Sequence, residues 1–420
     1  MPTGNTPAPK HDAYAVLKVR DFRFFLIFRF FTTIAFQMQS IIVGWQMYEL
    51  TRDPLALGLI GLAEALPNIA IALFAGHAAD KYNRKTIIVW FTLLFLVGTL
   101  ALFLFTVPKL GIIAALGVLP IYLVVAISGV SRAFLYPSII ALMSQLVPRE
   151  LYTNSSTWNS TVWHIGAITG PAIGGLVYGF FGVRVAYLAV LLFLLTALVL
   201  LGFVKNHPAP PVVKSETLVQ RLSSGLKFVY HNQILLGAMS LDMFAVLFGG
   251  AVAMLPIFAA EVLKVGPQGL GFLRAAPMVG AVMMSVVLAY RPPMVHAGRN
   301  MMIGVAGFGL SIICFALSRN FYLSLFLLMM SGMFDNISVI IRATAMQLLT
   351  PNDMRGRVAS VNAIFIGSSN EIGSFESGLA ARLIGLIPSV IFGGIMTLGI
   401  VGFTSKFAPR LRKLNLKDIG

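Results

Sequence analysis

Two long apolar runs of this 420-residue chain are joined by the polar stretch Gly76-His77-Ala78-Ala79-Asp80-Lys81-Tyr82-Asn83-Arg84-Lys85. The first run covers residues 55–79 and the second covers residues 87–107. Each run is long enough to cross a hydrocarbon core of about 30 Å as a helix, which takes about 20 residues. The quoted stretch is therefore expected to be a basic loop between two membrane-spanning helices.

The same alternation of apolar run and polar loop continues along the whole chain. Hydrophobic residues make up 58% of it and charged residues only 11%, whereas soluble domains carry about 25% charged residues. A water-soluble fold is thereby excluded, and we expect an all-α integral membrane protein with twelve transmembrane helices. The apolar runs cover residues 22–49, 55–79, 87–107, 117–146, 155–179, 183–204, 232–258, 269–290, 301–318, 321–349, 358–383 and 386–405.

The basic residues are distributed unevenly over the predicted loops. With both chain termini placed in the cytoplasm, 21 lysines and arginines lie on that side, 5 lie on the other and 5 lie inside the spans. Because cytoplasmic loops of membrane proteins collect Lys and Arg, this asymmetry predicts that both termini are cytoplasmic. It also accounts for most of the net charge of +16, so we expect no nucleic acid partner.

The longest polar connection divides the chain into two halves of six spans. Within it, Leu218, Leu222, Leu226 and Val229 share one helical face. This is typical of an amphipathic helix on the inner membrane surface, although a solvated tether explains the segment equally well. The predicted divisions are a cytoplasmic N-terminal tail (1–21), an N-terminal six-helix bundle (22–204), a cytoplasmic linker with the amphipathic helix (205–231), a C-terminal six-helix bundle (232–405) and a cytoplasmic C-terminal tail (406–420).

The two halves carry related sequences. Segment 145–150 resembles segment 347–353, and an offset of 203 then aligns Gly170 with Gly373 and Gly175 with Gly378. Parallel repeats of six helices characterise a transporter architecture in which substrate binds between the halves near the middle of the membrane. We therefore predict two pseudo-symmetric six-helix bundles with a binding cavity between them.

The loop at residues 76–85 has the residues of a conformational latch. Gly76 allows two helices to approach closely, and Asp80 can pair with cations or helix ends in one state and release them in another. The alternative is that the cations only determine topology. The cations of the predicted latch are Lys81, Arg84 and Lys85.

A second motif lies in the fifth span, Gly170-Pro171-Ala172-Ile173-Gly174-Gly175. Glycines four residues apart allow tight backbone packing, and Pro171 bends the helix where it can act as a seal or pivot. The alternative is that these residues serve helix packing alone, because membrane helices commonly use such glycines.

These motifs carry a resemblance to the major facilitator superfamily. The loop 76–85 resembles the superfamily signature between the second and third helices, departing from it at Asn83, where glycine is usual. The segment 170–175 is similar to its antiporter motif. Two further stretches are similar to the enterobactin-exporter and macrolide-efflux branch: Tyr48-Glu49-Leu50-Thr51-Arg52-Asp53-Pro54-Leu55-Ala56-Leu57-Gly58 and Thr350-Pro351-Asn352-Asp353-Met354-Arg355-Gly356-Arg357. The resemblance implies twelve helices, alternating access and export of small molecules by proton exchange.

Charged residues inside the spans are candidates for proton coupling. A charge at a helix centre costs about 2.5–3.5 kcal/mol on insertion scales, so each should face protein or a water-filled cavity and most should be paired. We expect Glu64 and Glu376 to be more peripheral, and Arg29 and Arg274 to lie near the membrane faces and snorkel. The candidates for the cavity or for proton coupling are Arg132, Asp242, Asp335, Arg342 and Glu371.

The remaining expectations concern substrate and energy source. Gln37 and Trp45 in the first span offer a hydrogen-bonding group and an aromatic face to an amphipathic substrate. No phosphate-binding loop, metal cluster or nucleophile motif occurs, so we expect no enzyme, no metal and no cofactor, with the proton gradient as energy source. The predicted protein is a monomeric secondary transporter in a bacterial cytoplasmic membrane that exports an amphipathic small molecule, either drug-like or siderophore-like, by proton-coupled efflux. Proton-coupled uptake, or a non-transporting membrane sensor with the same fold, are the alternatives.

Overall fold

The computed structural model describes residues 12–207, 218–351 and 354–418, and these are almost entirely helical. Six helices form the N-terminal half, after a short 3-10 turn at Ala15–Lys18. They are α1 (Arg20–Thr51), α2 (Pro54–Lys81), α3 (Arg84–Phe105), α4 (Ile112–Leu116), α5 (Leu119–Leu146) and α6 (Tyr152–Gly202). α4 is a single short turn in the loop between α3 and α5.

The C-terminal half begins with the linker helix. Its elements are α7 (Leu218–His231), α8 (Gln233–Phe248), α9 (Leu255–Ile257), α10 (Gly266–Tyr290), α11 (Ala297–Leu317), α12 (Phe321–Leu349), α13 (Arg355–Ile384), α14 (Leu386–Phe407) and α15 (Pro409–Arg412). Between α8 and α10 the chain is broken into a 3-10 turn, the short α9 and a π-helical turn. This irregular segment completes the seventh crossing of the membrane.

Ten helices within the described ranges are long and apolar enough to cross a membrane. One of them covers residues 149–202 and holds two crossings, because Gly182 has a φ of 81° and interrupts the helix there. α13 is 30 residues long but more polar, and it is not among the ten. With these two additions the helices supply the twelve crossings expected from the sequence.

Side-chain caps set where two of the long helices begin. Asp53 accepts a hydrogen bond from the backbone N–H of Leu55 at 3.0 Å and starts α2. Asn83 accepts one from Thr86 at 3.1 Å and starts α3. Such side chains satisfy backbone donors that a helix leaves free in its first turn. The short polar loops thus connect the helices and also supply the residues that cap them.

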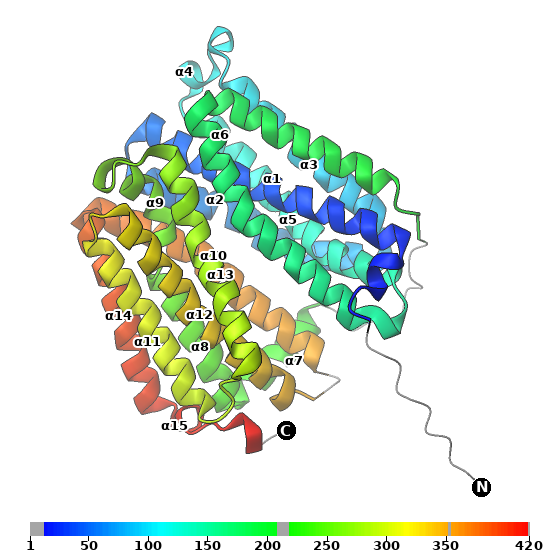
Figure 1. The fold of residues 1–420 in the computed structure, drawn as a ribbon, viewed down its shortest axis with the longest axis vertical. Coiled ribbons are helices and arrows are strands. Elements are labelled where there is room, and N and C mark those ends of the chain that lie inside the picture. The colour runs from blue at the N-terminus through cyan, green and yellow to red at the C-terminus, as the bar shows by residue number, and fades with distance from the viewer. Residues whose placement is uncertain (1–11, 208–217, 352–353, 419–420) are drawn as a thin grey trace.

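The two halves pack against each other chiefly through α2 with α13 and α6 with α10. Figure 1 shows the halves side by side, with the first described residues and the C-terminal helix α15 at one end of the bundles and α4 at the other. We call the end with the first and last described residues the terminal face and the end with α4 the far face. The close glycine contacts and the polar contacts between the halves lie in the far-face portions of the helices.

The predicted amphipathic helix of the linker corresponds to α7. Its Val229 is buried, and Gly225 lies against the backbone of Arg357 at the start of α13. Leu226 is half exposed. The helix therefore packs on the C-terminal half instead of forming a solvated tether, whereas residues 208–217 and the side chains of Leu218 and Leu222 lie outside the described part of the chain.

Candidate functional site

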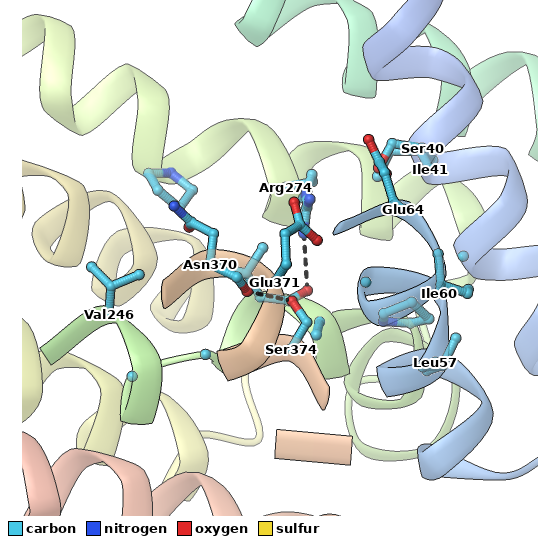
Figure 2. Close-up of a pocket in the computed structure, with 18 of the residues that line it drawn as sticks. Ser40, Ile41, Leu57, Ile60, Glu64, Val246, Arg274, Asn370, Glu371 and Ser374 are labelled. Atoms are coloured by element: carbon cyan, nitrogen blue, oxygen red, sulfur yellow. Dashed lines mark hydrogen bonds between the residues drawn. The ribbon is translucent and has the colours of Figure 1, made fainter. Parts of the chain in front are cut away.

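A cavity of about 460 Å³ lies between the two halves. The N-terminal half contributes residues of α1, α2 and α5, and the C-terminal half contributes residues of the broken seventh crossing, α10, α11, α12 and α13. Figure 2 shows a close-up of this cavity. Its polar and charged lining residues are Gln37, Ser40, Glu64, Arg132, Arg274, Asp335, Asn370, Glu371 and Ser374.

On the N-terminal side the cavity wall holds an ion pair. Nη1 of Arg132 on α5 lies 2.5 Å from Oε1 of Glu64 on α2. The guanidinium of Arg132 also lies over the ring of Phe36, 5.4 Å from its centroid, which is a favourable cation–π position. The pair and the ring together hold Arg132 in the wall of the cavity.

On the C-terminal side Arg274 has no carboxylate within ion-pair distance among the described residues. It donates a hydrogen bond from Nη1 to the backbone oxygen of Val252, at 3.1 Å. This oxygen is available because the seventh crossing is not α-helical at residues 249–254. Figure 2 shows Glu64 and Glu371 pointing into the space around Arg274.

The charges in the cavity do not balance. Three carboxylates, Glu64, Asp335 and Glu371, face two guanidinium groups, Arg132 and Arg274. One bound proton would make this set electrically neutral. An uncompensated charge inside a membrane protein is costly, so this set carries one carboxylate more than its arginines can balance.

Two sequence expectations about these charges are wrong. Glu64 was expected to be peripheral, yet it lines the cavity and pairs with Arg132. Arg274 was expected to snorkel to a membrane face, yet it lies in the cavity wall. The break in the seventh crossing provides the carbonyl oxygen that Arg274 binds, and apolarity alone does not reveal such a break.

Asp242 and Arg342 lie apart from the cavity. They form a buried ion pair between α8 and α12, in which the side chains are each 6% exposed. Ser338 donates a further hydrogen bond to Asp242 at 3.4 Å. Asp335 lies seven residues from Arg342 on the same helix, about 10.5 Å along its axis, and the ion-pair partner of Arg342 comes from another helix.

The two substrate-contact candidates separate in the structure. Gln37 lines the cavity. Trp45 is buried outside it and donates a hydrogen bond from Nε1 to Glu49 at 2.6 Å. Glu49 also accepts a hydrogen bond from Tyr178 at 2.6 Å, so Trp45 belongs to the internal packing of the N-terminal half near the far face.

Glycines close the far face of the cavity. A Cβ atom at Gly175 would lie 2.8 Å from Cα of Gly271, and one at Gly58 would lie 3.1 Å from Cα of Gly378. Gly170 and Gly174 of the same motif instead pack against Gln37 and Met38 of α1. The motif around Pro171 thus brings α6 against α1 with two glycines and against α10 with the third.

Polar contacts accompany these glycines at the far face. The Tyr48 hydroxyl donates a hydrogen bond to the Glu261 carboxylate across the two halves. Arg382 of α13 pairs with Asp53 before α2 at 3.2 Å. Together with the glycine contacts they close the cavity on the side of α4.

Toward the terminal face α2 and α13 diverge. A Cβ atom at Gly76 or at Gly367 would meet no atom within 4 Å, whereas the same helices touch at Gly58 and Gly378. The expected close approach of helices at Gly76 is therefore absent in this state. The cavity opens toward the terminal face.

The predicted latch residues lie at this open side. Asp80 is exposed and has no hydrogen bond or ion pair with any described residue. Arg84 donates hydrogen bonds to the backbone oxygens of Ala79 and Ala141, at 3.3 Å and 3.2 Å. The cations Lys81 and Lys85 contact, respectively, the ring of Tyr82 and the backbone oxygens at the end of α6. The cations thus bind within their own half and leave Asp80 unpaired.

Twelve crossings in two halves, closed around a charged cavity at one face and open at the other, define a multi-pass membrane transporter of the major facilitator fold. A family model described as transmembrane secretion effector matches residues 11–419. The chain belongs to this family of the major facilitator superfamily.

Known relatives and solved structures agree with this assignment. The chain is 24% identical over 383 residues to the enterobactin exporter of Shigella flexneri and to that of Escherichia coli O1:K1, with 90% of each chain covered. A POT family transporter in complex with 5-aminolevulinic acid has a similar fold, with a TM-score of 0.72 at 14% identity over 93% of this chain and 96% of that one. A bacterial homologue of the iron transporter ferroportin in an inward-facing state aligns with a TM-score of 0.69 at 16% identity, over 94% and 98% of the two chains.

Proposed function

We propose that this protein is a proton-coupled exporter that moves an amphipathic small molecule out of a bacterial cell by alternating access. The observation that carries the proposal is the cavity between the halves, closed at one face and lined by three carboxylates and two arginines. A cavity reachable from one side, between two repeats of six helices, is the arrangement that alternating access requires. The single chain contains the whole cavity, so a monomer suffices, and the proton gradient supplies the energy without a cofactor.

The terminal face is the cytoplasmic face in this proposal. The tails and loops that the sequence assigns to the cytoplasm carry 21 lysines and arginines, against 5 in the loops assigned to the other side, and the described cytoplasmic loops lie at the terminal face. The structure then corresponds to an inward-facing state, in which cargo enters from the cytoplasm. The division into tails, linker and two bundles follows the same orientation.

The cargo is a siderophore-like or drug-like molecule with both polar and apolar groups. The relatives named enterobactin exporters support this class, and so does the cavity, in which Gln37, Asn370 and Phe308 lie among the charges. The first test compares the metabolites released by cells with and without the gene. Enterobactin uptake into inverted and right-side-out vesicles then gives the direction: uptake only into inverted vesicles supports export, and uptake only into right-side-out vesicles contradicts it.

Glu371 is the proposed proton carrier, together with Asp335. We expect Glu371→Gln to lower pH-driven enterobactin uptake into inverted vesicles by at least about tenfold, because a permanently neutral side chain couples no proton to the transport cycle. Counterflow without a pH gradient should continue, since the cavity keeps its shape. Glu376→Gln on the same helix lies outside the cavity lining and serves as the matched control. Unchanged pH-driven uptake in Glu371→Gln would show that Glu371 does not carry the coupling proton.

Asp80 is proposed to stabilise the state in which the cytoplasmic side is closed. We expect Asp80→Asn to lower the population of that state and to slow its formation, because closing would bring the carboxylate to the N-terminal end of a neighbouring helix, an interaction that contributes about 0.3–1 kcal/mol, up to about 2 kcal/mol. Distances between spin labels at Thr86 and Arg299, both exposed at the terminal face, report the closing. Glu150→Gln removes an exposed carboxylate from a neighbouring loop and is the control. Identical distance distributions in Asp80→Asn and in the unmodified protein would contradict the latch.

A further inference from the structure

A second cavity, of about 340 Å³, lies between α12 and α13. It shares no lining residue with the central cavity but continues it along the same two helices toward the terminal face. On α12 the central cavity ends at Asp335 and the second begins at Val339; on α13 the change falls between Gly367 and Ile366. Its lining residues are Val339, Arg342, Ala343, Met346, Gln347, Thr350, Arg355, Val358, Ala359, Asn362 and Ile366.

Two buried polar atoms in this lining have no partner among the described residues. They are Oγ1 of Thr350, which is 4% exposed as a residue, and Oδ1 of Asn362. Leaving such a group unsatisfied costs about 1–3 kcal/mol. A water molecule occupies about 30 Å³ in the liquid, so the cavity has room for several waters that would satisfy both atoms.

The buried ion pair forms one wall of the second cavity. Arg342 lines it and binds Asp242 from behind. Asp335, Ser338 and Arg342 follow one another at spacings of three and four residues, so they share a face of α12. At one end of this row Asp335 lines the central cavity, and at the other end Arg342 lines the second.

The polar side chains that bind Asp242 both come from α12. Ser338 and Arg342 are the polar groups bound to it. Asp335 is the other carboxylate that interacts with it electrostatically. Among the described residues, α7, α11, α13, α14 and α15 also pack against α8 but place no charged side chain within ion-pair distance of Asp242.

We propose that the second cavity is a water-filled proton port and that the Asp242–Arg342 pair is its gate. The proposal rests on the proposed function, since it gives the coupling proton a route separate from that of the cargo. A proton leaves the carboxyl group of Asp335 and reaches Asp242 through water. The protonated Asp242 releases Arg342, then gives the proton to water in the second cavity and re-forms the pair.

A separate port solves a conflict in the inward-facing state. An exporter must release its proton to the cytoplasm and bind cargo from the cytoplasm through one opening. Cargo entering a cavity of about 460 Å³ displaces the water through which a proton would leave. The second cavity, between α12 and α13, keeps its water while cargo occupies the central cavity.

The test measures protonation without any cargo. Infrared difference spectra of reconstituted protein after a step from acidic to alkaline buffer follow the C=O band of protonated carboxyl groups. Asp242→Asn and Asp335→Asn assign the bands. Ala359→Phe fills the second cavity and is expected to slow deprotonation of both residues by about tenfold. Ala363→Phe on the same helix lies outside the lining and is expected to leave the rate unchanged. If Ala359→Phe does not fold, Ala343→Phe fills the cavity from α12.

Access of water is measured independently. In a Cys314→Ser background, which removes the one exposed cysteine, Ala359→Cys should react with a membrane-impermeant thiol reagent added at the terminal face. Three results would overturn the port: no titrating band for Asp242, equal deprotonation rates in Ala359→Phe and Ala363→Phe, or reaction of Ala359→Cys only with a lipid-soluble reagent. A working port in a chain that moves no cargo would instead contradict the proposed export.

Discussion

Arg342→Met is expected to lower the free energy of unfolding by about 3–5 kcal/mol, because it leaves Asp242 as an unpaired charge in a buried site. The side chains of both residues are 6% exposed, and the partner lies 100 residues away on another helix. Methionine keeps most of the volume of the arginine stem. The loss of unfolding free energy therefore comes from the unpaired charge and not from a new cavity. Unfolding in mixed detergent micelles measures the effect.

Two variants separate the ion pair from general packing. Combining Asp242→Asn with Arg342→Met removes both charges and should restore most of the stability, since apolar or neutral replacements of a buried pair are often tolerated. Arg355→Met removes an exposed arginine from the same second cavity, and it should change the stability by no more than about 0.5 kcal/mol. A cost below about 1 kcal/mol for Arg342→Met alone would show that the pair does not hold α8 to α12.

The helices of this protein follow from apolar run length, but the partners of its buried charges do not. Runs of about 20 apolar residues leave little choice of secondary structure in a bilayer, so the crossings expected from the sequence and those of the structure agree. Which charges meet depends on the tilt and rotation of separate helices. Asp335 and Arg342 lie seven residues apart on α12, about 10.5 Å along its axis, and spacing along that one helix cannot point to Asp242 on α8.

The errors at Glu64 and Arg274 have separate causes. Glu64 meets Arg132 of another helix in the cavity wall, and spacing along one helix does not reveal such a partner. The irregular backbone at residues 249–254 gives Arg274 a carbonyl oxygen within the membrane-spanning part of the chain. The Gly249-Gly250 pair is the sequence signal that could have indicated the break.

The glycine contacts between the halves lead to the second large effect. At Gly175 a Cβ atom would lie 2.8 Å and 2.9 Å from the backbone Cα and N of Gly271, on the opposite half. The backbone of α10 cannot move away by changing a rotamer, as a side chain can. A larger residue at position 175 must therefore push α6 and α10 apart. We expect Gly175→Val to favour the state in which the far face is open.

The size of this shift follows from the cost of overpacking, about 1–3 kcal/mol, which corresponds to about a 5–150-fold change in the ratio of the two states. Distances between spin labels at Lys109 and Arg319, exposed at the far face of the two halves, measure it in a Cys314→Ser background. Gly378→Val tests the other contact between the halves, where a Cβ atom would lie 2.8 Å from Cα of Gly58, and it should shift the distances in the same direction.

Gly399→Val is the matched control for Gly175→Val and Gly378→Val, because a Cβ atom at Gly399 meets nothing within 4 Å. If both Gly175→Val and Gly378→Val fold and leave the far-face distances unchanged, the halves do not move apart along these helices. If both shift the distances and Gly399→Val does not, the glycine contacts set the balance between the two states. The conformational equilibrium would then depend on backbone contact at the far face, while Asp80 acts on the opposite face.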